Sequence, residues 1–145
     1  MRLRDWIQRV PVGRGRRENR ARGAAIVEFA VVLPLLLTIL FGIIEYGWVF
    51  MVRQALQTAA REGTRVAILQ TSEAPYNAVL DRITEVMAPT GLTTYTVSMT
   101  HATTADPVET VRVVIPYDDV SLMGGFFGTH SYELGGACSM RKEGM

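Results

Sequence analysis

A carboxylate inside an apolar stretch is the strongest chemical signal in this chain. Glu28 lies near the start of residues 24–52, a run made almost entirely of aliphatic, aromatic and small side chains. A charge at hydrocarbon depth costs free energy, so an acid placed there indicates a function and a partner. The arginine-rich stretch before the run stops at Gly23, directly before Ala24. This junction indicates a processing site joined to a membrane anchor.

The flanking charges predict how the anchor is oriented. The leader, residues 1–23, carries eight arginines against Asp5 and Glu18, a formal charge of +6. Basic flanks resist translocation, so the leader is expected in the cytoplasm and the chain after Arg53 across the membrane. A bilayer core of about 30 Å needs about 20 helical residues, which residues 24–52 exceed. A secretory signal has a core of roughly 7–15 residues, so removal by signal peptidase is not expected.

The remainder has the composition of one small exported domain. Residues 73–145 hold nine acids and four bases, a formal charge of −5 that the whole-chain charge of +1 conceals. Domains of about 50 residues upward can fold, so one fits here. Cys138 is the only cysteine, which excludes an internal disulfide. A small buried apolar residue is its simplest interpretation, with pairing to another chain as the alternative.

The pattern divides the chain into four segments. Residues 1–23 form a flexible leader, 24–52 a membrane-spanning helix, 53–71 the continuation of that helix, and 72–145 an extracytoplasmic domain. Ala55, Ala59, Gly63 and Ala67 recur every four residues, so they share one helix face that another backbone can approach closely. The predicted partner of that face is either the chain's own sheet or a neighbouring helix.

The domain is predicted to be α+β. Thr71-Ser72 offers an N-cap for a second helix over residues 73–87, and Pro89-Thr90-Gly91 ends it. Period-two runs rich in β-branched residues predict antiparallel strands over 93–100 and 109–117, with a third strand within 129–140. The fold class is therefore α+β, a long N-terminal transmembrane helix followed by a helix packed on a short antiparallel sheet.

The motifs in their order resemble those of a known family. Gly23 with Ala-Ala-Ile-Val-Glu-Phe-Ala, then Leu33-Pro34-Leu35, Phe41-Gly42-Ile43-Ile44-Glu45-Tyr46-Gly47 and Ala59-Ala60-Arg61-Glu62-Gly63, are similar to the TadE-like minor pseudopilins of tight-adherence (Tad) type IV pilus systems. The resemblance covers about residues 20–67. The major Flp pilins are short and usually have tyrosine after the glutamate, where this chain has Phe29. TadF-like proteins, of comparable size, stay open as an alternative.

The resemblance implies a pilin-like fold, processing and assembly. A prepilin peptidase of the bacterial inner membrane would cut between Gly23 and Ala24, leaving the anchor intact. Glu28, with Phe29 beside it, would then pair with the new amino group of Ala24 in the same or an adjacent subunit, four residues away on one helix face. The implied partners are the peptidase, other minor pseudopilins, the Flp major pilin, inner-membrane platform proteins and the lipid bilayer. The domain would be periplasmic, or part of an extracellular pilus.

Two further residues of the apolar run invite interpretation. Glu45 is expected at the far membrane interface, flanked by Tyr46 and Trp48 as an aromatic belt. Pro34 removes a backbone hydrogen bond in mid-span, so a kink is expected there.

Catalysis is not expected, nor any cofactor or metal. A site from His101, His130 and Cys138 lacks the close ligand pairs typical of zinc, and Asp106, Asp118 and Asp119 lack the spacing of a calcium loop. The alternatives are an uncut single-pass scaffold with an extracytoplasmic interaction domain, or a nucleic-acid binder using Arg14 to Arg17. No aromatic residues interleave with that cluster for base stacking, so nucleic acid is not an expected partner.

Overall fold

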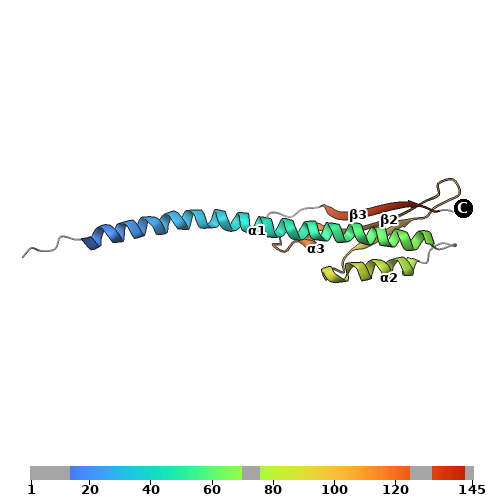
Figure 1. The fold of residues 1–145 in the computed structure, drawn as a ribbon, viewed down its shortest axis with the longest axis horizontal. Helices are drawn as coiled ribbons and strands as arrows, with labels where there is room; N and C mark the ends of the chain where they lie inside the picture. Colours follow the sequence, from blue (N-terminus) through green and yellow to red (C-terminus); the bar gives the residue numbers. More distant parts are fainter. Residues whose placement is uncertain (1–13, 70–75, 125–131, 143–145) are drawn as a thin grey trace, which may run out of the picture. The chain divides into compact units, whose positions relative to one another are not determined.

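The chain forms one long helix followed by a second helix and a three-stranded sheet. The structure, a computed structural model, describes residues 14–69, 76–124 and 132–142, with side chains from Arg22 onward. The elements, in order, are α1 (Arg14–Leu69), α2 (Tyr76–Met87), the 3-10 helix η1 (Ala88–Thr90), β1 (Thr96–Thr100), β2 (Val108–Pro116), α3 (Tyr117–Val120) and β3 (Glu133–Arg141) (Figure 1). Two compact units divide the chain, residues 1–41 and 42–145.

The first unit is the N-terminal part of α1. The helix begins at Arg14, so the predicted start at Ala24 is ten residues too late. Arginine, alanine and glutamate are good helix formers, and one glycine costs a helix only about 1 kcal/mol relative to alanine. These propensities outweigh the effect of Gly15 and of the repulsion between arginines. The earlier leader residues, 1–13, lie outside the described part.

The second unit is built on an antiparallel sheet in the order β1-β2-β3. β1 pairs with β2 in the register Val97 to Val113, and β2 pairs with β3 in the register Val111 to Cys138. Alternation along β2 buries Val111, Val113 and Ile115 on one face and leaves the intervening residues more exposed. The predicted α+β class and the three antiparallel strands are confirmed, with β2 ending one residue earlier than expected.

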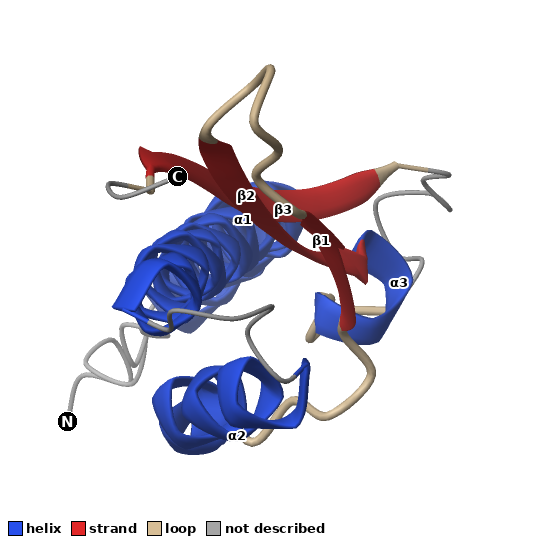
Figure 2. Ribbon diagram, turned by 90° about the vertical axis from the view of Figure 1, so that its right-hand side faces the viewer, coloured by secondary structure: helices blue, strands red, loops and turns tan. Residues whose placement is uncertain are grey.

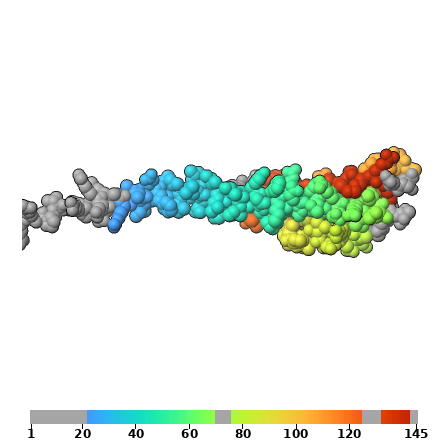
Figure 3. Space-filling model, in the orientation of Figure 1, coloured from blue at the N-terminus to red at the C-terminus, as the bar shows by residue number. Residues whose placement is uncertain are grey.

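Both long helices lie on the same side of the sheet, with the other face uncovered by any described helix (Figure 2). The core contains Val52, Leu56, Ala59 and Ala60 from α1 together with Val79, Ile83 and Met87 from α2. These α2 residues recur every four positions and so share one face of the helix. Figure 3 shows the side chains of α2, in yellow, packed directly on the green part of α1. The predicted N-cap at Thr71-Ser72 lies outside the described residues.

Two glycines allow the closest approaches in this unit. A Cβ atom on Gly136 of β3 would lie 2.5 Å from backbone atoms of Leu56 and Gln57 on α1, so strand and helix backbones touch there. A Cβ on Gly63 of α1 would lie 3.0 Å from the side chain of Ile83 on α2. β3 is further tied to α1 by the side chains of Gln57 and Thr64, which donate hydrogen bonds to the carbonyls of Ala137 (3.0 Å) and Cys138 (3.1 Å).

Candidate functional site

The candidate processing and pairing residues all lie on the exposed surface of α1. Gly23, Ala24, Glu28 and Phe29 are exposed, Phe29 by 61%. Ala24 and Glu28 are four residues apart and therefore share a helix face. Within the described part of the chain, the Glu28 carboxylate has neither a hydrogen bond nor an ion pair, and Arg22 is not its partner.

The surface around Glu28 is apolar on every side. Every side chain from Arg22 to Phe41 is exposed, and α1 is long and apolar enough to cross a membrane. The helix continues through Pro34, which has no N–H to give to the carbonyl of Ala30. Thr38 donates from Oγ1 to the Pro34 carbonyl at 2.8 Å. A helix with no buried face needs an apolar surrounding, and lipid supplies one.

The four-residue stripe on α1 is occupied within the chain. Ala59, Gly63 and Ala67 are buried and Ala55 is half-buried. Gly63 contacts Val79 and Ile83 of α2, so the helix that approaches this stripe is the chain's own second helix. Arg82 of α2 adds ion pairs at 3.0 Å to Glu62 of α1 and at 2.8 Å to Glu85, and these contacts raise the pKa of its guanidinium.

Glu45 differs from expectation. We expected it at the membrane interface, but it is buried, with 5% of its surface exposed, inside the second unit. Oε2 accepts hydrogen bonds from the backbone N–H groups of Leu122 (3.1 Å) and Met123 (3.2 Å), and Oε1 accepts one from the Tyr117 hydroxyl (3.3 Å). We call Glu45, Tyr117, Leu122 and Met123 the Glu45 cluster. Sequence could flag the acid but not these partners, which lie more than 70 residues away.

The two aromatic residues of the expected belt lie in different environments. Tyr46 is 73% exposed, whereas Trp48 is half-buried and donates from its indole nitrogen to the carbonyl of Val120 at 2.8 Å. α1 therefore holds the segment 117–123 at both ends through Glu45 and at Val120 through Trp48. Burial, then the nearby Glu45 carboxylate, raises the pKa of the Tyr117 hydroxyl above its usual value of about 10.

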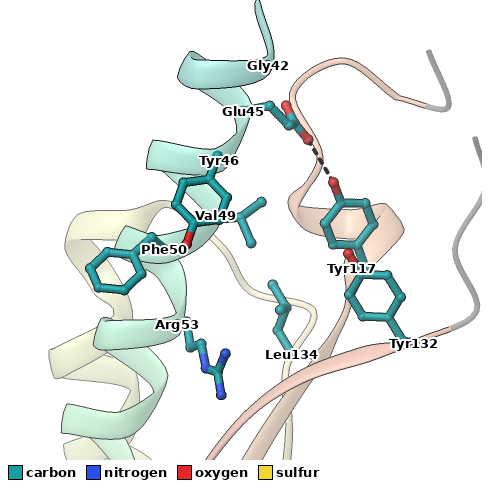
Figure 4. A pocket seen from close by; sticks show the side chains of 9 residues that line it. All are labelled: Gly42, Glu45, Tyr46, Val49, Phe50, Arg53, Tyr117, Tyr132 and Leu134. Carbon is teal, nitrogen blue, oxygen red and sulfur yellow. Dashed lines mark hydrogen bonds between the residues drawn. The ribbon is translucent and has the colours of Figure 1, made fainter. Parts of the chain in front are cut away.

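A pocket of about 500 Å³ opens beside the Glu45 cluster (Figure 4). One wall is the face of α1 that runs from Gly42 through Tyr46 and Val49 to Arg53, and the other wall consists of Tyr117, Tyr132 and Leu134. Apart from Glu45 and Arg53 the lining is aliphatic, aromatic or glycine. Sequence analysis missed this pocket, because its walls meet only when β3 packs beside α1.

Among the residues that the structure describes, those considered for metal binding form no cluster of potential ligands. His101 Nδ1 lies 2.8 Å from the buried carboxylate of Glu109, which also accepts from the N–H of Ala102 at 2.8 Å. His130 lies outside the described residues. Within the part of the chain that the structure describes, no group of three or more potential metal ligands is found. Cys138 is a free thiol of intermediate burial.

The geometry defines a class: a long apolar N-terminal helix that fits a membrane anchor, followed by a small domain with helices packed on a three-stranded antiparallel sheet. Residues 23–65 match the family model described as TadE-like protein, so the predicted resemblance is confirmed. This family consists of Tad pilus-associated structural and assembly components. The match includes Gly23, Glu28 and Glu45 but not the sheet. Neither the search of curated proteins nor that of solved structures found a match.

Proposed function

We propose that this protein is a minor pseudopilin of a Tad (Flp) type IV pilus, processed by prepilin peptidase and active in pilus biogenesis and adherence. One observation carries the proposal. Glu28 presents a carboxylate, unpaired among the described residues, on a helix surface that is otherwise apolar from Ala24 to Phe41. An acid in that position is costly unless a cation meets it. Cleavage after Gly23 creates such a cation, the α-amino group of Ala24, on the same face.

Cleavage requires a local change in α1. The bond between Gly23 and Ala24 lies in the interior of the helix, whereas a protease needs an extended backbone in its site. Glycine lowers the cost of opening a helix by about 1 kcal/mol relative to alanine. A Cβ at Gly23 would meet nothing within 4 Å, so the glycine is not required by packing. Ease of unwinding and access for the peptidase account for its presence.

Pairing then acts between subunits. An amino group and a carboxylate in a low-dielectric surrounding attract each other strongly, and each avoids the cost of an isolated buried charge. Such a pair would set the axial position of a subunit relative to its neighbour. The proposed neighbours are other minor pseudopilins and the Flp major pilin, with assembly at the platform proteins of the inner membrane.

The proposed topology follows from charge. The arginine-rich leader stays in the cytoplasm and the second unit is periplasmic, because basic flanks resist translocation. The bacterial inner membrane is the site of insertion.

The mature N-terminus tests the proposal. Mass spectrometry of the protein from cells with and without the candidate prepilin peptidase is expected to show a start at Ala24 only when the peptidase is present. An intact leader in both strains would contradict processing and favour an uncut single-pass scaffold, for which the uninterrupted helix through Gly23 is the supporting observation. The Gly23→Asp variant is expected to keep its leader in both strains.

A further inference from the structure

The pocket between α1 and the start of β3 has two chemically different ends. Figure 4 shows Glu45 at one end and Arg53 at the other, with Tyr46, Val49 and Leu134 between them. The Glu45 carboxylate already accepts three hydrogen bonds from the segment 117–123. Arg53 is exposed and has no ion pair among the described residues. The cation is therefore available to a ligand, and the acid is occupied.

A second cavity extends the cationic end. It measures about 410 Å³ and shares Arg53, Tyr132 and Leu134 with the first pocket. Arg112 of β2 lines it as a second exposed arginine, and Glu133 is its acid. Arg53 and Arg112 both line this second cavity, and two arginines suit a phosphate because guanidinium donates paired hydrogen bonds to phosphate oxygens.

The pocket has a direction along the chain. Gly42, at the end of the pocket where Glu45 lies, directly follows in sequence the exposed apolar stretch that ends at Phe41. Arg53 is three turns further along α1, about 16 Å at the usual helical rise. Tyr46 and Phe50 on the rim are 73% and 52% exposed, and aromatic side chains of this kind favour the membrane interface. Along the sequence, the Gly42 end of the pocket therefore adjoins the apolar stretch, and Arg53 is further from it.

We propose that this pocket binds one glycerophospholipid of the membrane in which α1 is anchored. An acyl chain lies along Gly42, Val49 and Leu134, and the phosphate is held by Arg53 with Arg112 beside it. A volume of about 500 Å³ falls within the range of ligand pockets. The inference rests on the membrane anchoring in the proposed function, and it assigns the second unit a lipid contact of its own. The bound lipid would hold that unit at the membrane surface until the subunit leaves the bilayer.

Native mass spectrometry of the full chain in detergent tests this inference. The probe is dioleoylphosphatidylglycerol, with inorganic phosphate as competitor. The wild-type chain is expected to retain one lipid, and Arg53→Gln is expected to weaken retention roughly tenfold, the equivalent of one charge-assisted contact of about 1.4 kcal/mol. Arg61→Gln is the matched control, because Arg61 is an exposed arginine on α1 that does not line the pocket. It is expected to bind lipid as the wild type does.

A pair of glycine variants tests the pocket without changing any charge. Gly42 and Gly47 are both helical glycines with open space around an added Cβ, but only Gly42 lines the pocket. Gly42→Leu is expected to abolish retention, whereas Gly47→Leu should leave it unchanged. Circular dichroism of each variant checks that the fold persists.

Three results would overturn the inference. They are equal retention by Arg53→Gln and Arg61→Gln, displacement of the ligand by inorganic phosphate, and a protein dimer in place of a lipid adduct. Carbonate extraction of cell membranes distinguishes failure of the lipid site from failure of the proposed function. A protein that stays in extracted membranes yet retains no lipid contradicts the lipid site alone, whereas a protein that washes off contradicts the anchor and the lipid site together.

Discussion

The carboxylate of Glu45 accepts a hydrogen bond from the backbone N–H of Leu122 at 3.1 Å, across 77 residues of sequence. With the bond from Met123 at 3.2 Å, it satisfies two adjacent donors of the segment that leads from α3 toward β3. The residue that sequence suggests for a lipid interface therefore fastens the segment 117–123 to α1. The folded domain begins on the helix at Gly42, since Glu45 and Val52 are already buried by it.

Removing the Glu45 carboxylate should destabilise the second unit. Glu45→Ala leaves the N–H groups of Leu122 and Met123 without an acceptor, and hydrogen bonds to a charged group contribute about 1.5–3 kcal/mol. We expect the free energy of unfolding of the full chain in detergent to fall by about 2 kcal/mol. Denaturant unfolding followed by circular dichroism measures it. Glu133→Ala, an exposed acid of β3, is the control and should change little; equal losses would show that Glu45 has no special role.

Gly136→Ala should be far more damaging than the same change one residue earlier. The new methyl group would lie 2.5 Å from backbone atoms of Leu56 and Gln57, which cannot move aside. At Gly135 the nearest atom is a methyl of Val114 at 3.0 Å, a side chain that can adjust. Forcing extra volume into packed structure costs about 1–3 kcal/mol, and a clash with backbone belongs at the upper end. Thermal unfolding compares the two variants, and a similar loss in both would contradict the backbone contact.

Alkaline conditions should reveal the shifted Tyr117. Its pKa is raised, so the folded chain holds this proton at pH values where the unfolded chain releases it. The stabilisation is complete below pH of about 10, the ordinary tyrosine value, and is lost as pH rises through the folded pKa. We expect Tyr117→Phe to lose less stability than the wild type between neutral pH and pH of about 11. Parallel curves of unfolding free energy against pH for the two proteins would refute this.

Neutralising Glu28 should separate processing from assembly. Glu28→Gln keeps the size and helix position but cannot pair with a charged amino group, so cleavage after Gly23 should proceed normally. Surface pili, counted by electron microscopy, should fall roughly tenfold, since losing a charge pair in lipid costs more than about 1.4 kcal/mol. Glu28→Asp retains the charge and should recover part of the loss. Normal piliation in Glu28→Gln would end the pairing proposal.

Sequence predicted the fold well wherever the signal is local. The strands were visible because Val97, Val111 and Val113 alternate with polar residues, and a half-buried strand has a period of two. α2 was visible from the spacing of Val79, Ile83 and Met87. The predicted start of α1 was too late because Gly13, Gly15 and the run of arginines were expected to disfavour a helix. The helix propensity of the surrounding residues outweighs them.

Local patterns also gave the candidate processing site, whose residues are neighbours in sequence. Gly23, Ala24 and Glu28 fall within two turns of one helix, so their shared face follows from helical geometry alone. A glycine pair within a strand signals a close backbone approach, so Gly135-Gly136 offered a clue that was not used.

Sequence by itself determined the long apolar helix, the small α+β domain and the TadE-like identity of residues 23–65, since each depends on residue types at short spacing. Only the tertiary structure decided that the Ala59 and Gly63 stripe meets the chain's own α2 and that Glu45 is buried under the segment 117–123. It also decided that Arg53 lines a pocket together with a residue of β3. The physical reason is the same in all three cases. Side chains separated by tens of residues meet only when apolar faces are buried together, and which faces meet depends on packing over the whole unit.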